Sequence, residues 1–230
     1  MDILYTLFLK THMFAGLAAL VVFWLPALTK KGSPVHRKAG KWFVIAMTIV
    51  AITGVPLTAR FYLMGQWVGA TFLAYLLVIT MTAISTAWFS LKLKHDRDRY
   101  YGTPYKLLSV LNVAVGGSVL YLGLAYDVML LTLFSFIGIL AGIDGLKRAR
   151  KKDELSDKWW LEEHLGGMIG AGIAAHVAFG AFGLRQILPE YGAFDGFVGM
   201  LPWILPVVIG VAASVYSTRK YAPKQKQTAA

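Results

Sequence analysis

Four of the five histidines lie in or at the edge of long apolar stretches, where an imidazole can hold a cofactor or carry a proton. His12 falls in the first apolar stretch, and His36 opens the second. His164 and His176 share a later stretch, twelve residues apart, which is about 18 Å along a helix. Ionisable side chains inside membrane spans are costly and are often functional. These four histidines are therefore the first candidates for chemistry.

The four histidines fall at two depths if each apolar stretch is a membrane-spanning helix. His12 and His176 are expected in the outer half, and His36 and His164 at the cytoplasmic ends of their helices. Pairs of neutral imidazoles on facing helices at two depths are what a transmembrane protein with two haem b groups requires. This pattern predicts haem b as cofactor, electron transfer as function, and His12, His36, His164 and His176 as ligands. The alternative is ordinary packing, with each imidazole hydrogen-bonded.

Glycines follow three of these histidines at a spacing of four residues, at Gly16, Gly40 and Gly180. Residues at this spacing share a helix face. A missing side chain one turn from a ligand would leave room for a flat macrocycle. Small residues at helical spacing equally favour close helix packing.

A second constellation of polar residues is expected at the cytoplasmic end of the spans. Its members are Asp144, Glu162, Glu163 and His164. Mixed carboxylate and imidazole ligands suit a divalent metal such as zinc, which could activate water in a membrane hydrolase. The same polar residues could serve a small-molecule or ion carrier, or form an interfacial salt-bridge network.

The elements that position these residues are apolar and long. Hydrophobic residues make up 57% of the 230 residues and charged residues 15%, which places the chain in the membrane class. We predict an all-α bundle of seven transmembrane helices, over 3–29, 36–59, 67–91, 105–126, 128–146, 160–187 and 197–218. One transmembrane domain then covers 1–218, and 219–230 form a polar cytoplasmic tail.

Two features inside the fourth and fifth spans bear on the architecture. Only Gly123 and Asp127 mark a turn between these spans. A single helix of about 40 residues would be about 60 Å long, twice the thickness of the hydrocarbon layer, so we place a turn there. Asn112 is a lone polar residue in its span, and we expect it to hydrogen-bond a neighbouring helix.

Basic residues predict the orientation of the bundle. The three loops after the first, third and fifth spans, together with the C-terminal tail, hold 20 of the 23 lysines and arginines. The other three are Lys10, Arg60 and Arg185. Positive loops stay in the cytoplasm, so the N-terminus is expected outside and the C-terminus in the cytoplasm. The net charge of +11 is thereby explained by topology, and the lipid bilayer rather than nucleic acid is the expected partner.

Absent residues narrow the chemistry further. Because the chain has no cysteine, it forms no disulfide, cysteine-ligated cluster or thioether-linked haem. The seventh span contains no lysine that could carry retinal. An electron-transfer function would need a redox or membrane protein as a partner.

The first hairpin resembles an uncharacterised bacterial multipass family, domain of unknown function 2306. The resemblance rests on His12 and Gly16, on the run from Lys31 through His36-Arg37 and Gly40 to Met47, and on a later segment, Trp160 to Ala175, that contains His164. It covers about a third of the chain and implies an integral membrane protein of about seven helices, without an established activity. The His-Arg-x-x-Gly element is also similar to cytochrome b561-like proteins.

Overall fold

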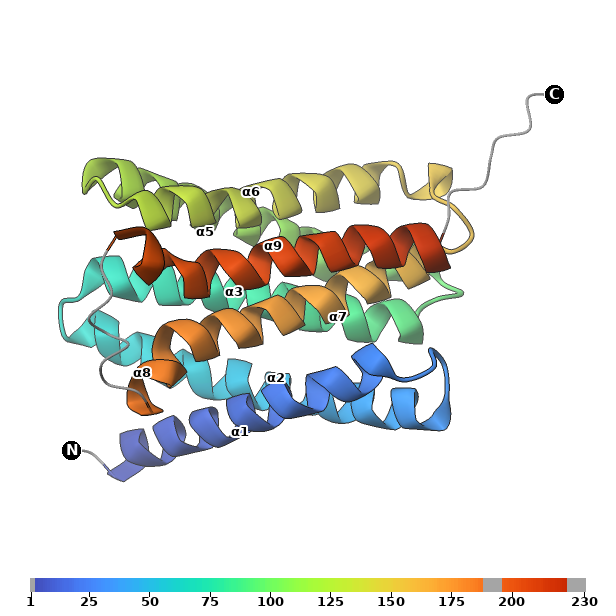
Figure 1. Ribbon diagram of the computed structural model, residues 1–230. Helices are drawn as coiled ribbons and strands as arrows, with labels where there is room; N and C mark the ends of the chain where they lie inside the picture. The colour runs from blue at the N-terminus through green and yellow to red at the C-terminus, as the bar shows by residue number, and fades with distance from the viewer. Residues whose placement is uncertain (1–2, 188–195, 223–230) are drawn as a thin grey trace.

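The computed structural model describes residues 3–187 and 196–222, which fold into an up-and-down bundle of long helices (Figure 1). Seven helical segments of the described residues are long and apolar enough to cross a membrane. They are built on α1 (Ile3–Leu28), α2 (Pro34–Leu63), α3 (Trp67–Lys92), α5 (Thr103–Ala125), α6 (Met129–Arg150), α7 (Trp159–Ala178) and α9 (Gly196–Tyr221). A helix satisfies its own backbone hydrogen bonds, as a span in lipid must. The predicted all-α, seven-span membrane protein is confirmed.

Four short elements complete the described part of the chain: α4 (Arg97–Tyr100), the 3₁₀ turn Lys152–Glu154, the π-helical turn Phe179–Gly183 and α8 (Leu184–Ile187). The helix α4 lies in a segment expected to be a polar loop. It forms because the Asp96 side chain accepts a hydrogen bond from the backbone N–H of Arg99 at 2.9 Å and so caps the turn. The π turn interrupts the span predicted over 160–187.

The turn between α1 and α2 is built by side chains suited to it. Gly32 has a positive φ of 78°, which glycine adopts without a steric penalty. Ser33 caps α2, because its hydroxyl accepts a hydrogen bond from the backbone N–H of His36 at 3.2 Å. Pro34 takes the first helical position, where its missing N–H costs nothing. This cap fixes where His36 enters the bundle.

The turn between α5 and α6 falls where the sequence predicted it. Asp127 has a positive φ of 52° and reverses the chain within three residues. At Gly123, a Cβ would lie only 2.6 Å from the backbone nitrogen of Thr132, so the two helices meet here without a side chain between them. The close approach requires glycine.

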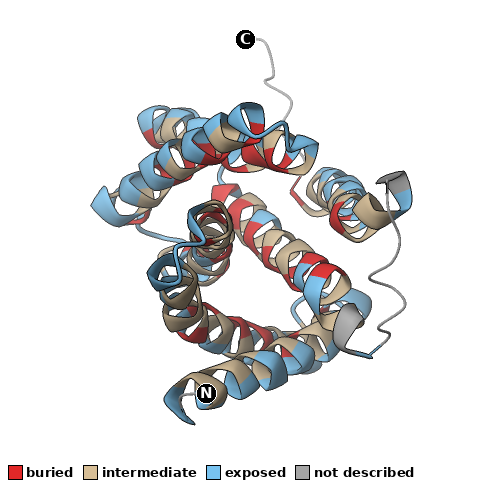
Figure 2. Ribbon diagram, turned by 90° about the vertical axis from the view of Figure 1, so that its left-hand side faces the viewer, coloured by how far each residue is buried: buried red, intermediate tan, exposed pale blue. Residues whose placement is uncertain are grey.

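Helices α5 and α6 pack as one antiparallel pair and α1 and α2 as another, while α3 and α7 lie between the pairs (Figure 1). Helix α9 packs on α7. Buried residues face the interior of the bundle and exposed ones face outward (Figure 2). The largest buried cluster joins α3, α5, α6, α7 and α9 around Tyr75, Phe134 and Trp203. Large apolar side chains such as Leu28 and Leu124 cover the outside, where lipid would contact them.

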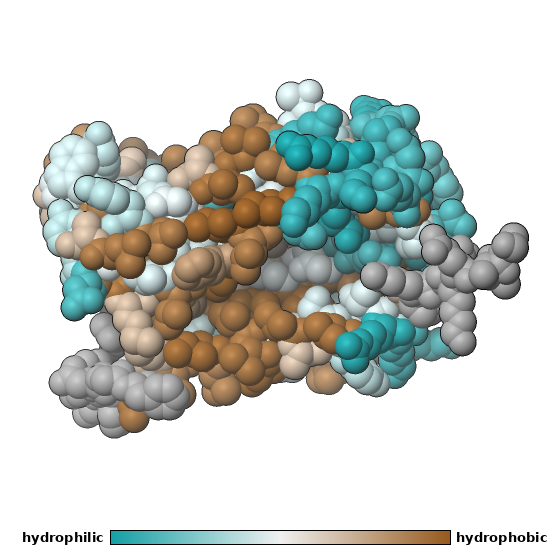
Figure 3. Space-filling model, turned by 90° about the horizontal axis from the view of Figure 1, so that it is seen from above, coloured by the Kyte–Doolittle hydropathy of each residue, from teal (hydrophilic) through white to brown (hydrophobic). Residues whose placement is uncertain are grey.

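Charged residues gather at one end of the bundle. The loops after α1, α3 and α6 and the end of α9 lie together, opposite the N-terminus (Figure 1, right). The surface at this end is hydrophilic, next to a broad hydrophobic band (Figure 3). Helix α9 continues to Tyr221, three residues beyond the predicted boundary at 218. Residues 223–230 of the predicted tail lie outside the described residues.

Candidate functional site

Three of the four membrane histidines direct Nδ1 at a backbone carbonyl oxygen. The distances are 3.0 Å from His36 to Pro26, 2.9 Å from His164 to Ala87, and 2.8 Å from His176 to Gly172. A carbonyl oxygen only accepts hydrogen bonds, so the neutral imidazole carries its proton on Nδ1. Nε2 is then left with an unprotonated lone pair.

His12 follows the same rule through a hydroxyl. Its Nδ1 lies 3.1 Å from the Oγ1 of Thr53. That hydroxyl already donates its proton to the carbonyl of Ile49 at 2.7 Å, so it accepts from His12. All four imidazoles are therefore fixed in the tautomer with Nδ1 protonated. This is the arrangement of metal-ligating histidines, in which an oxygen partner orients the ring and Nε2 binds the metal.

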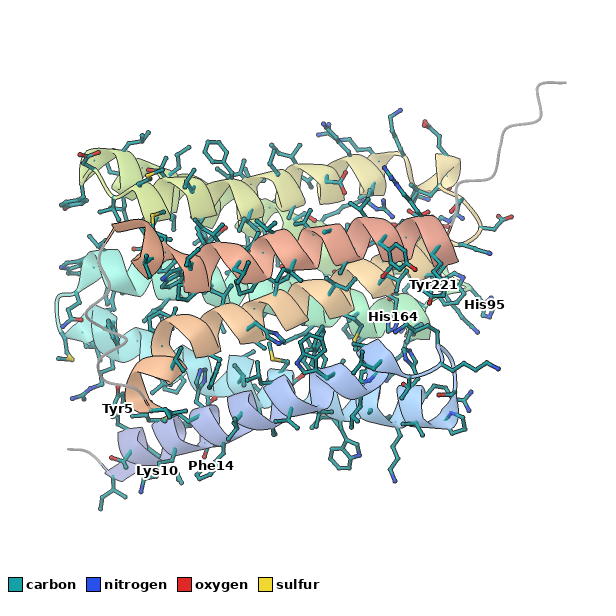
Figure 4. All side chains as sticks on the ribbon, viewed as in Figure 1. Tyr5, Lys10, Phe14, His95, His164 and Tyr221 are labelled. Carbon is teal, nitrogen blue, oxygen red and sulfur yellow. The ribbon has the colours of Figure 1, made fainter. Side chains whose placement is uncertain are left out.

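His36 and His164 come from different helices and meet at the basic end of the bundle. His36 lies in the first turn of α2 and His164 in the second turn of α7, and the two imidazoles are close enough to interact electrostatically. Both are half-buried. The labelled His164 lies near the end that carries the polar loops (Figure 4). The structure thus brings together the predicted inner pair.

A glycine and a methionine border the space beside this pair of histidines. Gly40 follows His36 by four residues, and Met168 follows His164 by four, so each shares a helix face with its histidine. A Cβ on Gly40 would lie 3.7 Å from the methyl carbon of Met168, an ordinary contact. Gly40 is therefore not required by close backbone packing. Met168 is a flexible side chain that can change rotamer and vacate the space.

The other two predicted glycines differ from each other. A Cβ on Gly16 would lie 3.9 Å from its nearest neighbour, Val50, and would fit. A Cβ on Gly180 would lie 3.0 Å from Pro202 on α9, which is tighter than an ordinary contact. Helix packing explains Gly180, whereas Gly16 and Gly40 leave room beside His12 and His36.

His12 and His176 do not face each other. The ring of His176 packs edge-on against Phe23 and Trp24, with centroids 5.3 and 5.5 Å apart. These two residues lie eleven and twelve positions after His12, which is about 16–18 Å along α1. The predicted outer pair is thus separated in depth: His12, on α1, is bonded to Thr53 of α2, whereas the ring of His176, on α7, packs against α1. The π turn of α7 begins three residues after His176.

A buried carboxylate, Glu163, organises the ends of α5, α6 and α7. It accepts hydrogen bonds from the Nε of Arg148 at 2.6 Å and from the hydroxyls of Tyr101 at 2.9 Å and Tyr100 at 3.1 Å. Arg148 also pairs with Glu162 at 3.2 Å. In the sequence, Arg148 is expected to pair with Asp144 rather than with Glu163, and no pattern points to these tyrosines. The one sequence feature that could have indicated these contacts is the pair of adjacent tyrosines, Tyr100 and Tyr101, beside a basic loop.

The four residues proposed for a divalent metal do not gather into one site. Asp144 is exposed on α6, and His164 turns Nδ1 to Ala87. Glu162 and Glu163 are bound by Arg148, as in the salt-bridge alternative. Within residues 3–187 and 196–222, no group of three or more histidines and carboxylates is arranged to hold a metal ion. His95, the fifth histidine, is exposed in the loop before α4.

The chain was compared with models of protein families, with curated proteins and with solved structures, and none of the three comparisons found a match. The molecule is a multi-pass membrane protein, and His36 and His164 lie near each other at its basic end.

Proposed function

We propose that this chain is a b-type haem protein of the bacterial cytoplasmic membrane, in which His36 and His164 hold haem b for electron transfer. The observation that carries the proposal is the shared hydrogen-bond geometry of the membrane histidines: each Nδ1 lies within hydrogen-bond distance of an oxygen, which leaves Nε2 as the nitrogen for a ligand. Low-spin haem iron is ligated by imidazole nitrogens of this kind. When bound, haem supplies one-electron redox chemistry.

The protein's own residues would hold the group and tune it. The carbonyls of Pro26 and Ala87 orient the two rings and raise the basicity of Nε2. Gly40 leaves the adjacent face of α2 open once Met168 moves aside. Basic residues at the same end, such as Arg37, offer charge for the haem propionates. Because His12 and His176 lie at different depths, a second haem is not part of the proposal.

An optical spectrum tests the proposal. The protein would be expressed with added haem precursor, purified in detergent, and measured as a reduced-minus-oxidised difference spectrum. We expect a Soret band at about one haem per chain. His36→Ala and His164→Ala should each lose the band, and the matched control His95→Ala should keep it.

Two results would overturn the proposal. One is a wild-type protein without a Soret band after haem supplementation. The other is full haem content in both His36→Ala and His164→Ala. Metal analysis of the same preparation examines the non-redox alternative: stoichiometric zinc without haem would favour a metal-dependent hydrolase. A preparation with neither cofactor would favour a carrier.

A further inference from the structure

A groove opens at the basic end of the bundle, between the end of α1 and the last turn of α9. It holds about 530 Å³ and is lined by Ala27, Leu28, Thr29, Lys30, Lys31 and Tyr221. The apolar spans of α1 and α9 end at Leu28 and Tyr221, so the groove lies where hydrocarbon gives way to headgroups. Tyr221 is labelled at this end of the bundle in Figure 4.

One wall of the groove is a lysine fixed on the end of α1. The ammonium of Lys31 donates to the carbonyl oxygens of Pro26 at 2.8 Å and Ala27 at 2.7 Å. A helix C-terminus carries partial negative charge, which favours a cation there. Since an ammonium group has three donors, one remains for a further acceptor. Partial burial lowers the pKa of Lys31, and the nearby charge of Lys220 lowers it further.

The positive charges around the groove lack acidic partners. Among the residues that the structure describes, no carboxylate forms an ion pair with Lys30, Lys31 or Lys220. Lys220 is held in place by the hydroxyl of Tyr216 at 3.1 Å and by the ring face of Tyr221 at 5.4 Å. Like charges held close together repel each other, and an anion in the groove would relieve this repulsion.

An apolar stripe leads from the hydrocarbon region into the groove. Val21, Leu25 and Leu28 are exposed on α1 at spacings of four and three residues, which places them on one face. A ligand that matches the site therefore combines an anionic head with an apolar tail. A free phosphate has no apolar part that could contact these side chains.

We propose that this groove binds the headgroup of an anionic phospholipid from the surrounding leaflet. The lipid phosphate accepts hydrogen bonds from Lys30 and Lys31, the nearby Lys220 adds positive charge, and an acyl chain lies along Val21 and Leu25. The cytoplasmic leaflet supplies such lipids, and basic residues near its surface are attracted to them. The inference does not depend on haem binding.

Native mass spectrometry of the full chain in detergent, titrated with phosphatidylglycerol, tests the inference. The double variant K30Q/K220Q removes one charge from the groove lining and one beside it, and leaves the Lys31 contacts with α1 intact. We expect its apparent Kd for phosphatidylglycerol to rise about 30-fold, since each lysine near an anionic lipid is worth about a fivefold change in affinity. The matched control K38Q/K41Q changes the same charge at exposed positions of α2 and should bind like the wild type.

Three outcomes would overturn the assignment. Equal weakening in K30Q/K220Q and K38Q/K41Q would show a response to overall surface charge. Equal wild-type affinity for phosphatidylglycerol and phosphatidylcholine would show that the groove does not distinguish lipids by their net charge. Displacement of the lipid by an equal concentration of soluble glycerol phosphate would assign the groove to a free anion.

Discussion

At the scale of single residues, Glu163 shows how a charge is kept at the end of a membrane bundle. Its side chain is only 6% exposed, and Arg148 and the hydroxyls of Tyr100, Tyr101 and Tyr105 donate to its oxygens. Removing a carboxylate from water costs several kcal/mol, which the ion pair and its added hydrogen bonds offset. The group is therefore sensitive to the loss of any one partner.

The substitution Glu163→Ala should lower the free energy of unfolding by about 3–5 kcal/mol, because it leaves Arg148 without its buried partner. Glu162→Ala should cost about 1 kcal/mol or less, since Glu162 is more exposed and Arg148 keeps Glu163. Equilibrium unfolding in mixed detergent micelles measures both variants. Equal losses would show that the buried contact does not dominate.

His164 also has a structural role that can be separated from haem. Its Nδ1 bond to Ala87 ties α7 to α3. Without haem, His164→Ala should lose about 1 kcal/mol of stability from this hydrogen bond and more from lost packing. His95→Ala should change stability by less than about 0.5 kcal/mol, as at other exposed positions. Thermal unfolding of both variants checks the difference, and a larger loss in His95→Ala would contradict it.

The candidate histidines could be recognised in the sequence by residue type, whereas the oxygen atoms that they hydrogen-bond could not. The histidines stand out because imidazoles are rare in apolar stretches. The carbonyls of Pro26 and Ala87, which bond His36 and His164, belong to other helices, and a carbonyl has no side-chain signature. The expected interhelical bond of Asn112 is confirmed, since it donates to Thr82 on α3 at 2.7 Å.

At the scale of elements, glycines decide how close α7 comes to α3. A Cβ on Gly167 would fall on the backbone nitrogen of Ala87 and within 2.7 Å of the carbonyl oxygen of Ala83. A Cβ on Gly166 would meet nothing within 4 Å. Adjacent glycines on one helix thus have opposite roles, and the difference follows from the face on which each lies.

The pair Gly167→Ala and Gly166→Ala tests this packing. Gly167→Ala should destabilise the bundle by about 1–3 kcal/mol, because backbone cannot move aside as a side chain can. Gly166→Ala should be neutral or stabilising by up to about 1 kcal/mol, since alanine is the better helix former. Thermal unfolding in one detergent compares them. Equal behaviour would contradict the close approach of α3 and α7.

Hydropathy predicted the helices well because each span must be long and apolar. The start of α3 and that of α1 agree with the predicted residues. Helix α2 runs past Pro56 to Leu63, beyond the predicted end at 59, because a proline removes one donor without ending a helix in a membrane. The π turn after α7 escaped prediction, since its segment is as apolar as its neighbours.

At the scale of the whole molecule, the basic loops are concentrated at one end of the bundle. Every loop predicted to be cytoplasmic lies at the end where α9 finishes (Figure 1). Lys152 at this end bonds Asp98, which links two of these loops and raises the pKa of Lys152. The structure therefore agrees with a single basic side, as the positive-inside rule requires.

Reporter fusions test the orientation. Fusions at Ser33, Asp98 and Asp153 should all report cytoplasm, because they lie at the basic end. Fusions at Gln66 and Asp127, in the opposite turns, should report the periplasm. A periplasmic signal from any of the first three positions would contradict the orientation.

The three-residue turn around Asp127 has a consequence for how the protein is made. Helices α5 and α6 are joined only by Tyr126, Asp127 and Val128. The turn that must be carried across the bilayer during biogenesis therefore has one charged residue and no long polar loop. Such a pair can leave the translocation channel together, already matched along its glycine contacts, instead of crossing one helix at a time. Lengthening the turn with polar residues would then slow insertion of the nascent chain before it disturbed the finished protein.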